Sequence, residues 1–306
     1  MLSRDAEHLY WLSRYVERFE NTARMINVHA ELMLDFQGSQ SSGWKPIIST
    51  IDSDKLFKIN YSKYNEVTVL KFLGDDKENP NSIISSISKA RYNAQAIKDD
   101  LPRAAIEQLN NLFYEFSDGM TSSSARKRAA HIYNVISGSQ RFFGIISDNF
   151  SRGYEFEFMR LGRFIERVDM ISRIIDSLCI KKKETYKNNF ATLEWISMLK
   201  TLSAYEAFRK KTRGEIEKDD VIFFLCKDDS FPRSIYRCLK ILERSLLTLP
   251  NNKAVSEVAS KLTKKVEKSK INFYNDTQLH NFFEFLEKKI NFLDENIHKT
   301  YFHNYL

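Results

Sequence analysis

Arginine and glutamate recur at helical spacing in two separate segments of the chain, and these are the side chains that could do chemistry. Carboxylates can transfer protons, and guanidinium groups bind carboxylates or phosphates through paired hydrogen bonds. One segment starts at Leu12 and the other at Leu161. Together they supply the candidates for a binding or structural charge cluster: Arg14, Glu17, Arg18, Glu20, Arg24, Arg163, Glu166, Arg167, Asp169 and Arg173.

Two long helices, at residues 3–35 and 154–182, are predicted to position these side chains. In the first, apolar residues recur at three- and four-residue steps and predict one buried stripe, formed by Leu9, Leu12, Val16, Phe19, Ala23 and Ile26. Because residues three or four apart share a helix face, Arg14, Glu17 and the charged residues that follow are expected opposite this stripe. The charged residues of the second helix have the same spacing.

The two segments form an internal repeat. Most positions from Leu12 to Asn27 are identical or chemically similar to their partners from Leu161 to Asp176. The repeat predicts two related halves, approximately 1–150 and 151–306, packed about a pseudo-twofold axis. The sequence leaves open whether these halves form one continuous bundle or two packed half-domains.

The charged faces allow two interpretations. An exposed face would carry ordinary salt bridges, each contributing only about 0.2–0.5 kcal/mol. Around a pseudo-twofold axis, Glu17 and Glu166 would instead meet among arginines, and buried charges persist only as paired, hydrogen-bonded sets. Such a cluster would order the bundle or receive a charged ligand. The arginines would keep both carboxylates ionised, which favours anchoring over proton transfer.

The composition predicts an all-α, multi-helix bundle. The chain has 23 Phe to fill a core but only 9 Gly and 5 Pro, residues that sheets and phosphate-binding loops use in their turns. A net charge of +7 comes from dispersed lysines and arginines, so nucleic-acid binding is not expected. The longest apolar run, at 221–226, is far too short to span a membrane.

Cysteine usage and the first residues favour a cytoplasmic protein. Cys179, Cys226 and Cys238 form no Cys-x-x-Cys pair, and an odd number cannot close a disulfide framework. We expect them to be small buried residues. Arg4 and Asp5 stand where a signal sequence would need apolar residues.

Sequence motifs for cofactors and metals are weak. The chain contains no Gly-x-x-x-x-Gly-Lys-[Ser/Thr] or Gly-x-Gly-x-x-Gly segment, the usual phosphate-binding loops. Glu295 and His298 have the Glu-x-x-His spacing of di-iron bundles, but such bundles need two of these motifs and two further glutamates. We therefore expect no cofactor and no metal site.

Several motifs, in order along the chain, resemble the Alpha-E family, an all-helical bacterial domain. They are Met1-Leu-Ser-Arg4, Leu9-Tyr-Trp-Leu12 through Glu17-Arg18, Glu20-Asn-Thr-Ala-Arg24, Ala90-Arg91-x-Asn93-Ala94, Leu161-Gly-Arg-Phe-Ile-Glu-Arg167 and Phe231-Pro-Arg-Ser234. Trp11, Arg91, Asn93 and Arg233 are therefore secondary candidates for polar or binding contacts. The chain departs from the family pattern at Tyr92 and Gln95, which puts a site at that segment in doubt.

The resemblance implies a context rather than a reaction. Alpha-E proteins accompany circularly permuted ATP-grasp ligases and transglutaminase-like proteins, so this chain is expected to be an accessory or scaffold subunit of a peptide ligase or peptide-tagging system. The alternative is an enzyme or ligand-binding domain whose Arg/Glu faces enclose a carboxylate-bearing metabolite or peptide end. The sequence leaves open whether the chain also associates with copies of itself.

Overall fold

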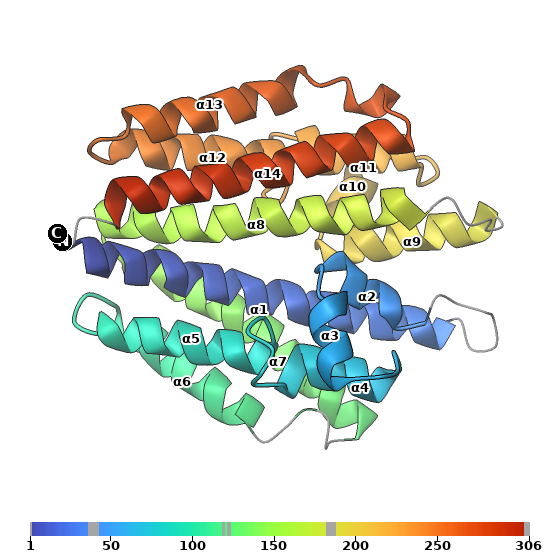
Figure 1. Ribbon diagram of the computed structural model, residues 1–306, viewed down its shortest axis with the longest axis horizontal. Coiled ribbons are helices and arrows are strands. Elements are labelled where there is room, and N and C mark those ends of the chain that lie inside the picture. Colours follow the sequence, from blue (N-terminus) through green and yellow to red (C-terminus); the bar gives the residue numbers. More distant parts are fainter. Residues whose placement is uncertain (1, 36–42, 118–119, 121–123, 182–187, 303–306) are drawn as a thin grey trace. The chain divides into compact units, whose positions relative to one another are not determined.

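The protein is all-helical in the part of the chain that its structure describes. A computed structural model describes residues 2–35, 43–117, 120, 124–181 and 188–302, and every regular element in these ranges is a helix (Figure 1). The all-α, multi-helix prediction is therefore confirmed. The chain separates into two compact units, Met1–Arg163 and Phe164–Leu306, and the division falls inside helix α8 (Tyr154–Lys181). The pseudo-twofold relation between halves stays a prediction.

Helix α1, Ser3–Asp35, is the central helix of the N-terminal unit, and its bounds agree with the prediction. All six residues of the expected apolar stripe are buried, with none more than 2% exposed. Burial does not stop at the stripe, because Ser13, Glu17, Glu20 and Asn21 are buried as well. Helix α1 is thus covered on its polar side too, and its charged residues need partners within the protein.

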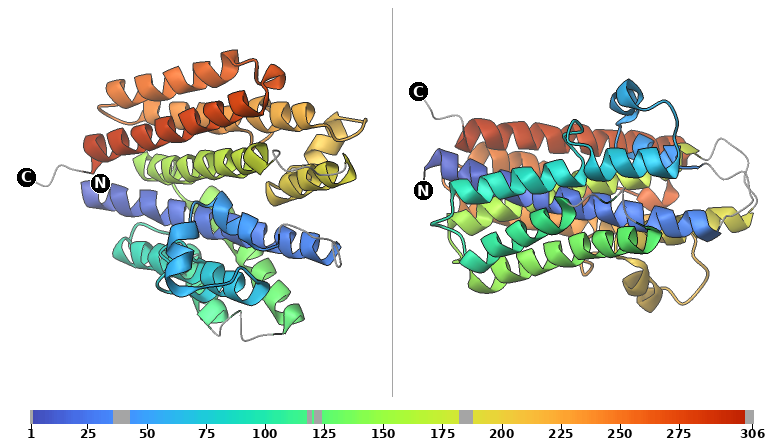
Figure 2. Two further views of the ribbon diagram at one scale, coloured as in Figure 1. Left: turned by 45° about the vertical axis from the view of Figure 1, so that its right-hand side comes forward. Right: turned by 90° about the horizontal axis from the view of Figure 1, so that it is seen from below.

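Three further helices complete the main bundle of this unit: α5 (Ile83–Ala96), α6 (Arg103–Ser117) and α7 (Ala125–Asn149). Helix α1 packs against α5 and α7, and α6 packs against both α5 and α7. Figure 2 shows these four helices running alongside one another. Gly138 of α7 permits the close approach to α6, since a Cβ atom there would lie 2.4 Å from a methyl carbon of Leu112.

The sequence pattern predicts a pair of short helices over about 46–73, but the segment between α1 and α5 forms still shorter pieces. They are α2 (Lys45–Thr50), α3 (Asp54–Asn60), α4 (Glu66–Leu70) and one turn of π-helix at Lys71–Asp75. Asp52, between α2 and α3, has φ of 51°, a left-handed conformation that cannot continue a helix. Phe57 and Phe72 fix these pieces to each other through an edge-to-face contact.

The described part of the C-terminal unit contains residues 164–181 of α8, six further α-helices and a turn of 3-10 helix at Ile271–Phe273. The six α-helices are α9 (Asn188–Thr201), α10 (Tyr205–Lys211), α11 (Lys218–Lys227), α12 (Ile235–Thr248), α13 (Lys253–Lys268) and α14 (Asp276–Tyr301). Helix α13 packs against α12 and α14, and α11 packs against α9, α12 and α13. A capping box at Asn275 and Gln278 starts α14.

The helical pattern of the sequence predicts one helix over 190–211, and this prediction is wrong because the structure has two, α9 and α10. Ser203 has φ of 51°, so the chain reverses between the two helices. The backbone N–H of Ala204 then bonds to the carbonyl of Leu199, which closes α9. Ala204 is fully buried, so the break is held by packing as well as by hydrogen bonds.

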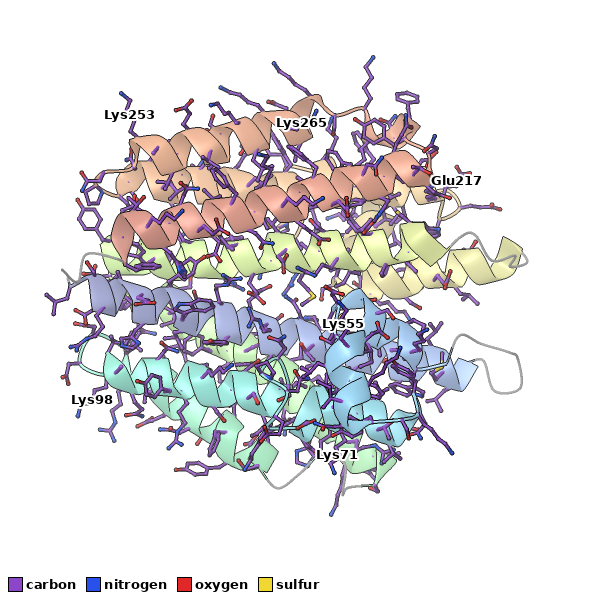
Figure 3. All side chains as sticks on the ribbon, in the orientation of Figure 1. Lys55, Lys71, Lys98, Glu217, Lys253 and Lys265 are labelled. Carbon is purple, nitrogen blue, oxygen red and sulfur yellow. The ribbon has the colours of Figure 1, made fainter. Side chains whose placement is uncertain are left out.

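Exposed lysine side chains lie on the outside of each unit. Lys98 and Lys253 are examples, and Figure 3 labels both at the edge of the ribbon. Cys179, Cys226 and Cys238 are free thiols and buried, as expected. Among the helices that the structure describes, none combines the length and apolar character needed to cross a bilayer.

Candidate functional site

The charge cluster of the N-terminal unit is built on a fully buried glutamate, Glu17. Its Oε2 accepts a hydrogen bond from Nε of Arg163 at 3.2 Å, and its Oε1 lies 3.5 Å from the amide nitrogen of Asn21. Glu17 is 0% exposed, whereas the side chain of Arg163 is 28% exposed. The Arg163 guanidinium also lies 3.5 Å from the centroid of the Phe143 ring. Arg163 therefore connects α8 to both α1 and α7.

A glycine makes this ion pair possible. A Cβ atom on Gly162 would lie 2.1 Å from the Tyr10 carbonyl oxygen and 2.4 Å from Oγ of Ser13. Ser13 in turn donates to the same Tyr10 carbonyl at 3.0 Å. Only a residue without a side chain fits here, because the obstacle is α1 backbone. Gly162 thus lets α8 approach α1 closely enough for Arg163 to reach Glu17.

Other charged residues of α1 contact the helix itself, an aromatic ring or the loop that precedes α5. Arg24 binds Glu20 one turn earlier, with Nη2 to Oε1 at 2.8 Å. Arg14 is buried, and its guanidinium lies 4.9 Å from the centroid of the Trp11 ring. Arg18 donates from Nη1 to the Asn81 side-chain oxygen at 3.2 Å. The buried ion pairs rule out an ordinary solvated face for this part of the helix.

The matching residues of α8 in the C-terminal unit are also buried or paired. Glu166 and Arg167 are 2% and 4% exposed, and the Arg167 guanidinium lies 5.1 Å from the Phe164 ring centroid. Arg173 donates from Nε to Oδ2 of Asp169 at 3.0 Å. The Asp169–Arg173 pair therefore reproduces within α8 the spacing and contact of Glu20–Arg24 in α1.

Helix α14 brings a second set of polar residues to this part of α8, and sequence reasoning missed them. Both oxygens of Asp176 contact Nδ1 of His280, at 2.9 and 3.0 Å. Glu287 lies 3.9 Å from Nη1 of Arg173. The sequence does contain a pattern that could have indicated them. Asp169, Arg173 and Asp176 are spaced by four and then three residues, and so are His280, Glu284 and Glu287, which places each set on one face of its helix.

Carboxyl groups in this second set bind protons more readily than usual. Burial raises the pKa of Glu287 to about 7; the Arg173 charge opposes this, whereas Asp169, Asp176 and Glu284 reinforce it. Burial also raises the pKa of Asp176, although the hydrogen bond from His280 lowers it. The α8–α14 contact thus holds a carboxyl that changes charge near neutral pH.

No arrangement of His, Cys, Asp and Glu suited to holding a metal ion occurs among the described residues.

The comparison with protein families matches residues 1–302 to Alpha-E, described as a predicted alpha-helical domain with a conserved ER motif. The chain belongs to the Alpha-E family. Glu17-Arg18 and Glu166-Arg167 are Glu-Arg pairs at the centre of the two charged segments. No curated protein and no solved structure matched the chain.

The Ala90–Ala94 segment of this Alpha-E protein uses its polar residues to hold helices together. Arg91 donates from Nε to the Asn110 side-chain oxygen at 2.6 Å, and its guanidinium lies 4.8 Å from the Phe113 ring centroid on α6. The Asn93 amide donates to the Lys89 carbonyl, and its oxygen lies 2.8 Å from Nδ1 of His8 on α1. Both secondary candidates therefore have structural contacts.

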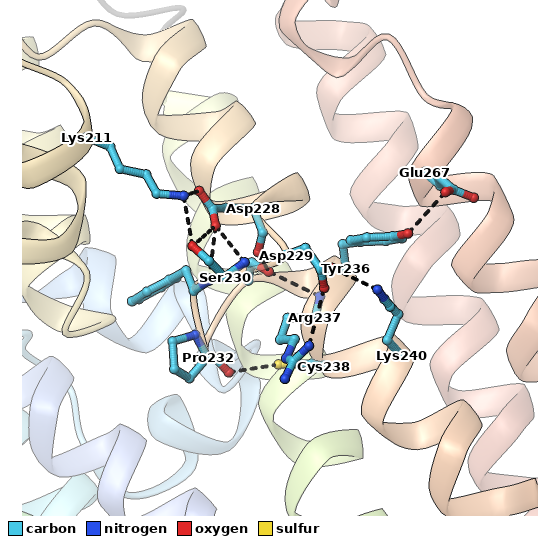
Figure 4. Close-up of polar contacts among 12 residues, drawn as sticks. Lys211, Asp228, Asp229, Ser230, Pro232, Tyr236, Arg237, Cys238, Lys240 and Glu267 are labelled. Carbon is cyan, nitrogen blue, oxygen red and sulfur yellow. Dashed lines mark hydrogen bonds and ion pairs between the residues drawn. The ribbon is translucent and has the colours of Figure 1, made fainter.

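The Phe231–Ser234 motif of the Alpha-E chain forms a turn that starts α12 (Figure 4). The order of Ser230 and Phe231-Pro232-Arg233 in the sequence predicts a Ser230 cap followed by a proline in the first helical turn, and this prediction is wrong. Ser234 is the cap, because its Oγ accepts from the Arg237 N–H at 3.1 Å. Asp228 accepts the N–H groups of Ser230 and Phe231, so the chain turns before the helix begins.

Charged residues around this turn anchor it. Arg233, within the motif, is only 9% exposed. Lys211 binds Asp228, while Lys240 contacts Asp229 at 2.8 Å. These bonds lower the pKa of both aspartates. Burial acts in the opposite direction on Asp228, but the bonds outweigh it. The motif forms the turn that leads into α12.

Proposed function

We propose that this Alpha-E protein is a cytoplasmic accessory or scaffold subunit of an ATP-grasp peptide ligase or peptide-tagging system. Its partners in this proposal are an ATP-grasp-type ligase and a transglutaminase-like protein, and catalysis resides in those partners. Neither nucleic acid nor a membrane is part of the proposed role.

The single observation that supports this role is the burial of Glu17 and its bond to Arg163. A general acid or base must exchange its proton with substrate or water. Glu17 has no exposed surface, and the adjacent guanidinium favours its ionised form. A buried pair of this kind orders a bundle, so the signature residues contribute a defined shape rather than a reactive group.

Co-purification and turnover together test the proposal. The tagged full-length chain is expected to retain the ATP-grasp ligase from the same cells and to raise its turnover. If folded wild-type protein neither retains the ligase nor raises its turnover, the scaffold role is contradicted. Glu17→Gln is the informative variant, because the amide keeps the shape of the carboxylate. If Glu17 is structural, the Glu17→Gln variant should stimulate the ligase in proportion to the fraction of the variant that is folded. If Glu17 were catalytic, the folded variant would be inactive.

The second candidate is an enzyme or ligand-binding domain that acts on a carboxylate-bearing metabolite or peptide end. The observation that favours it is the pairing of Arg173 with Glu287, a guanidinium next to a carboxyl whose pKa lies near 7. Arginine can bind a ligand carboxylate while such a carboxyl transfers a proton. Thermal-shift measurements with amino acids and short peptides test this candidate. It fails if acidic ligands stabilise the wild type and Arg173→Gln equally.

A further inference from the structure

Lysines cover the outward face of helix α13, which packs against α12 and α14 in the C-terminal unit (Figure 1). Four of them are exposed and follow one another at steps of three, one and three residues: Lys261, Lys264, Lys265 and Lys268, here called the lysine stripe. An α-helix turns by about 100° and rises about 1.5 Å per residue, so the stripe occupies an arc of about 100° and a length of about 10 Å. The opposite side of α13 is buried and contains Val255, Ala259, Leu262 and Val266. The four ammonium groups therefore face solvent on one side of one helix.

Most of the stripe has no acidic partner. Lys261 binds Glu257, with Nζ to Oε1 at 2.6 Å. The other acidic residue of α13 is Glu267, which accepts a hydrogen bond from the Tyr236 hydroxyl of α12 at 3.1 Å. The remaining three lysines of the stripe form no ion pair or hydrogen bond with another described residue. Three neighbouring positive charges are thus left uncompensated by the described part of the protein.

Helix α14 adds a fifth cation and two aromatic rings to this surface. Lys265 and Lys289 each lie 5.9 Å from the centroid of the Phe285 ring. Lys289 also lies 5.6 Å from the ring centroid of Phe292, which is 46% exposed. Two helices therefore contribute to one surface that combines lysines with apolar area.

The like charges of the stripe are not explained by the stability of α13. Residues of the same charge three or four positions apart destabilise a helix, whereas opposite charges, such as Lys288 and Glu284 on α14, stabilise it. The helix dipole favours cations in the last turn, which accounts for Lys265 and Lys268 but not for the rest of the stripe. A row of uncompensated like charges is typical of a surface that meets a partner of opposite charge.

An acidic segment of a protein is the occupant that fits this surface. Carboxylates repeated along one side of such a segment can pair with the stripe, while its apolar side chains cover Phe292. An amphipathic helix binds a membrane by inserting its apolar face, and that face of α13 is buried in the bundle. Proteins that bind nucleic acid commonly contact about 6–10 phosphates, more than five lysines provide. The surface therefore matches a protein better than a lipid bilayer or a nucleic acid.

We propose that the lysine stripe, with Lys289 beside it, docks an acidic segment of a partner protein. In the proposed function that partner is the ATP-grasp-type ligase, so the identity of the partner rests on that proposal. The inference adds the surface and the charge by which the partner is recognised. Because the lysines are exposed, salt should weaken the contact.

Co-purification at several salt concentrations tests this surface on the full chain. The triple variant Lys264→Gln, Lys265→Gln and Lys268→Gln should retain about tenfold less ligase than wild type. A second triple variant, Lys55→Gln, Lys58→Gln and Lys98→Gln, changes the net charge equally at exposed positions of the N-terminal unit and should behave like wild type. If the two triple variants retain the ligase equally, the docking surface is refuted while the scaffold role stands. If wild-type protein retains no ligase, the scaffold role fails, and titration with an acidic peptide decides about the surface.

Polyglutamate is the probe that does not require the ligase. Its affinity, measured by fluorescence anisotropy, should be equal for wild type and the control variant and about tenfold lower for the stripe variant. Equal affinity for all three proteins would overturn the proposal. A DNA oligonucleotide and vesicles of anionic lipid should bind more weakly than polyglutamate, and tighter binding of either through the stripe would overturn the assignment to an acidic protein. Unchanged circular dichroism spectra ensure that folded proteins are compared.

Discussion

Arg163 donates a hydrogen bond from Nε to Oε2 of Glu17 at 3.2 Å, across a sequence separation of 146 residues. The acceptor is completely buried, and the donor reaches it from α8. The charged signature thus contains more than local i to i+4 pairs. Its central glutamate is used in a tertiary contact that defines the core of the N-terminal unit.

Removing the arginine should destabilise the protein strongly. Arg163→Met removes a guanidinium that bonds the buried Glu17 carboxylate, and we expect a loss of about 3 kcal/mol in the free energy of unfolding. Replacing both residues by Met should cost less than Arg163→Met alone, since the buried carboxylate is then removed as well. Urea unfolding monitored by circular dichroism measures both values.

The exposed pair of Arg103 and Glu107 is the control for this experiment. Its side chains are 92% and 57% exposed, so Arg103→Met should change stability by no more than about 0.5 kcal/mol. A similar cost for Arg103→Met and Arg163→Met would show that the buried pair has no special importance.

Two helical glycines should respond to alanine in opposite directions. Gly162→Ala places a Cβ atom 2.1 Å from the Tyr10 carbonyl oxygen, so α1 and α8 must separate, at a cost of about 2 kcal/mol or more. A Cβ atom on Gly144 of α7 meets nothing within 4 Å, and Gly144→Ala should stabilise by about 0.5–1 kcal/mol. Thermal melts of the two variants should shift down and up respectively. A neutral Gly162→Ala would refute the close approach.

Glu287 should make stability depend on pH. Its pKa is about 7 in the folded protein and 4.5 ordinarily, so between these values the folded state keeps a proton that the unfolded state has released. The free energy of unfolding should therefore fall as pH rises from 4.5 to 7 and then level off. Because the side chain is 22% exposed, we expect a decrease of about 1–2 kcal/mol.

Glu287→Gln should remove this part of the pH dependence and make the protein more stable than wild type above pH 7. Denaturant unfolding at several pH values, compared as the difference between variant and wild type, isolates the effect. Glu295→Gln, at an exposed position of the same helix, serves as the control. If the difference in free energy of unfolding between Glu287→Gln and wild type does not change with pH, the raised pKa of Glu287 is disproved.

The three thiols should be unreactive in the folded protein. Cys179, Cys226 and Cys238 are no more than 3% exposed, and burial raises the pKa of Cys226 strongly. Thiolate is the reactive form, so native protein should react with Ellman's reagent at the rate at which it unfolds. All three should react quickly in denaturant. Rapid labelling of any one under native conditions would indicate an opening that the structure does not have.

The sequence by itself determined the helices and the chemical character of their faces. Periodicity of 3.6 residues is a local property, so the bounds of α1 and its buried stripe from Leu9 to Ile26 could be predicted. The repeated charges were visible for the same reason. Local periodicity fails where a single backbone conformation decides, as at Ser203, whose positive φ separates α9 from α10.

Tertiary structure alone decided what the charged faces do. Spacing places Glu17 on a helix face but cannot say which helix covers that face, because the Arg163 contact depends on the approach that Gly162 allows. The pKa of Glu287 likewise follows from burial against α8, which no local pattern reports. Burial and electrostatic coupling depend on which surfaces meet, and residues distant in the sequence supply those surfaces.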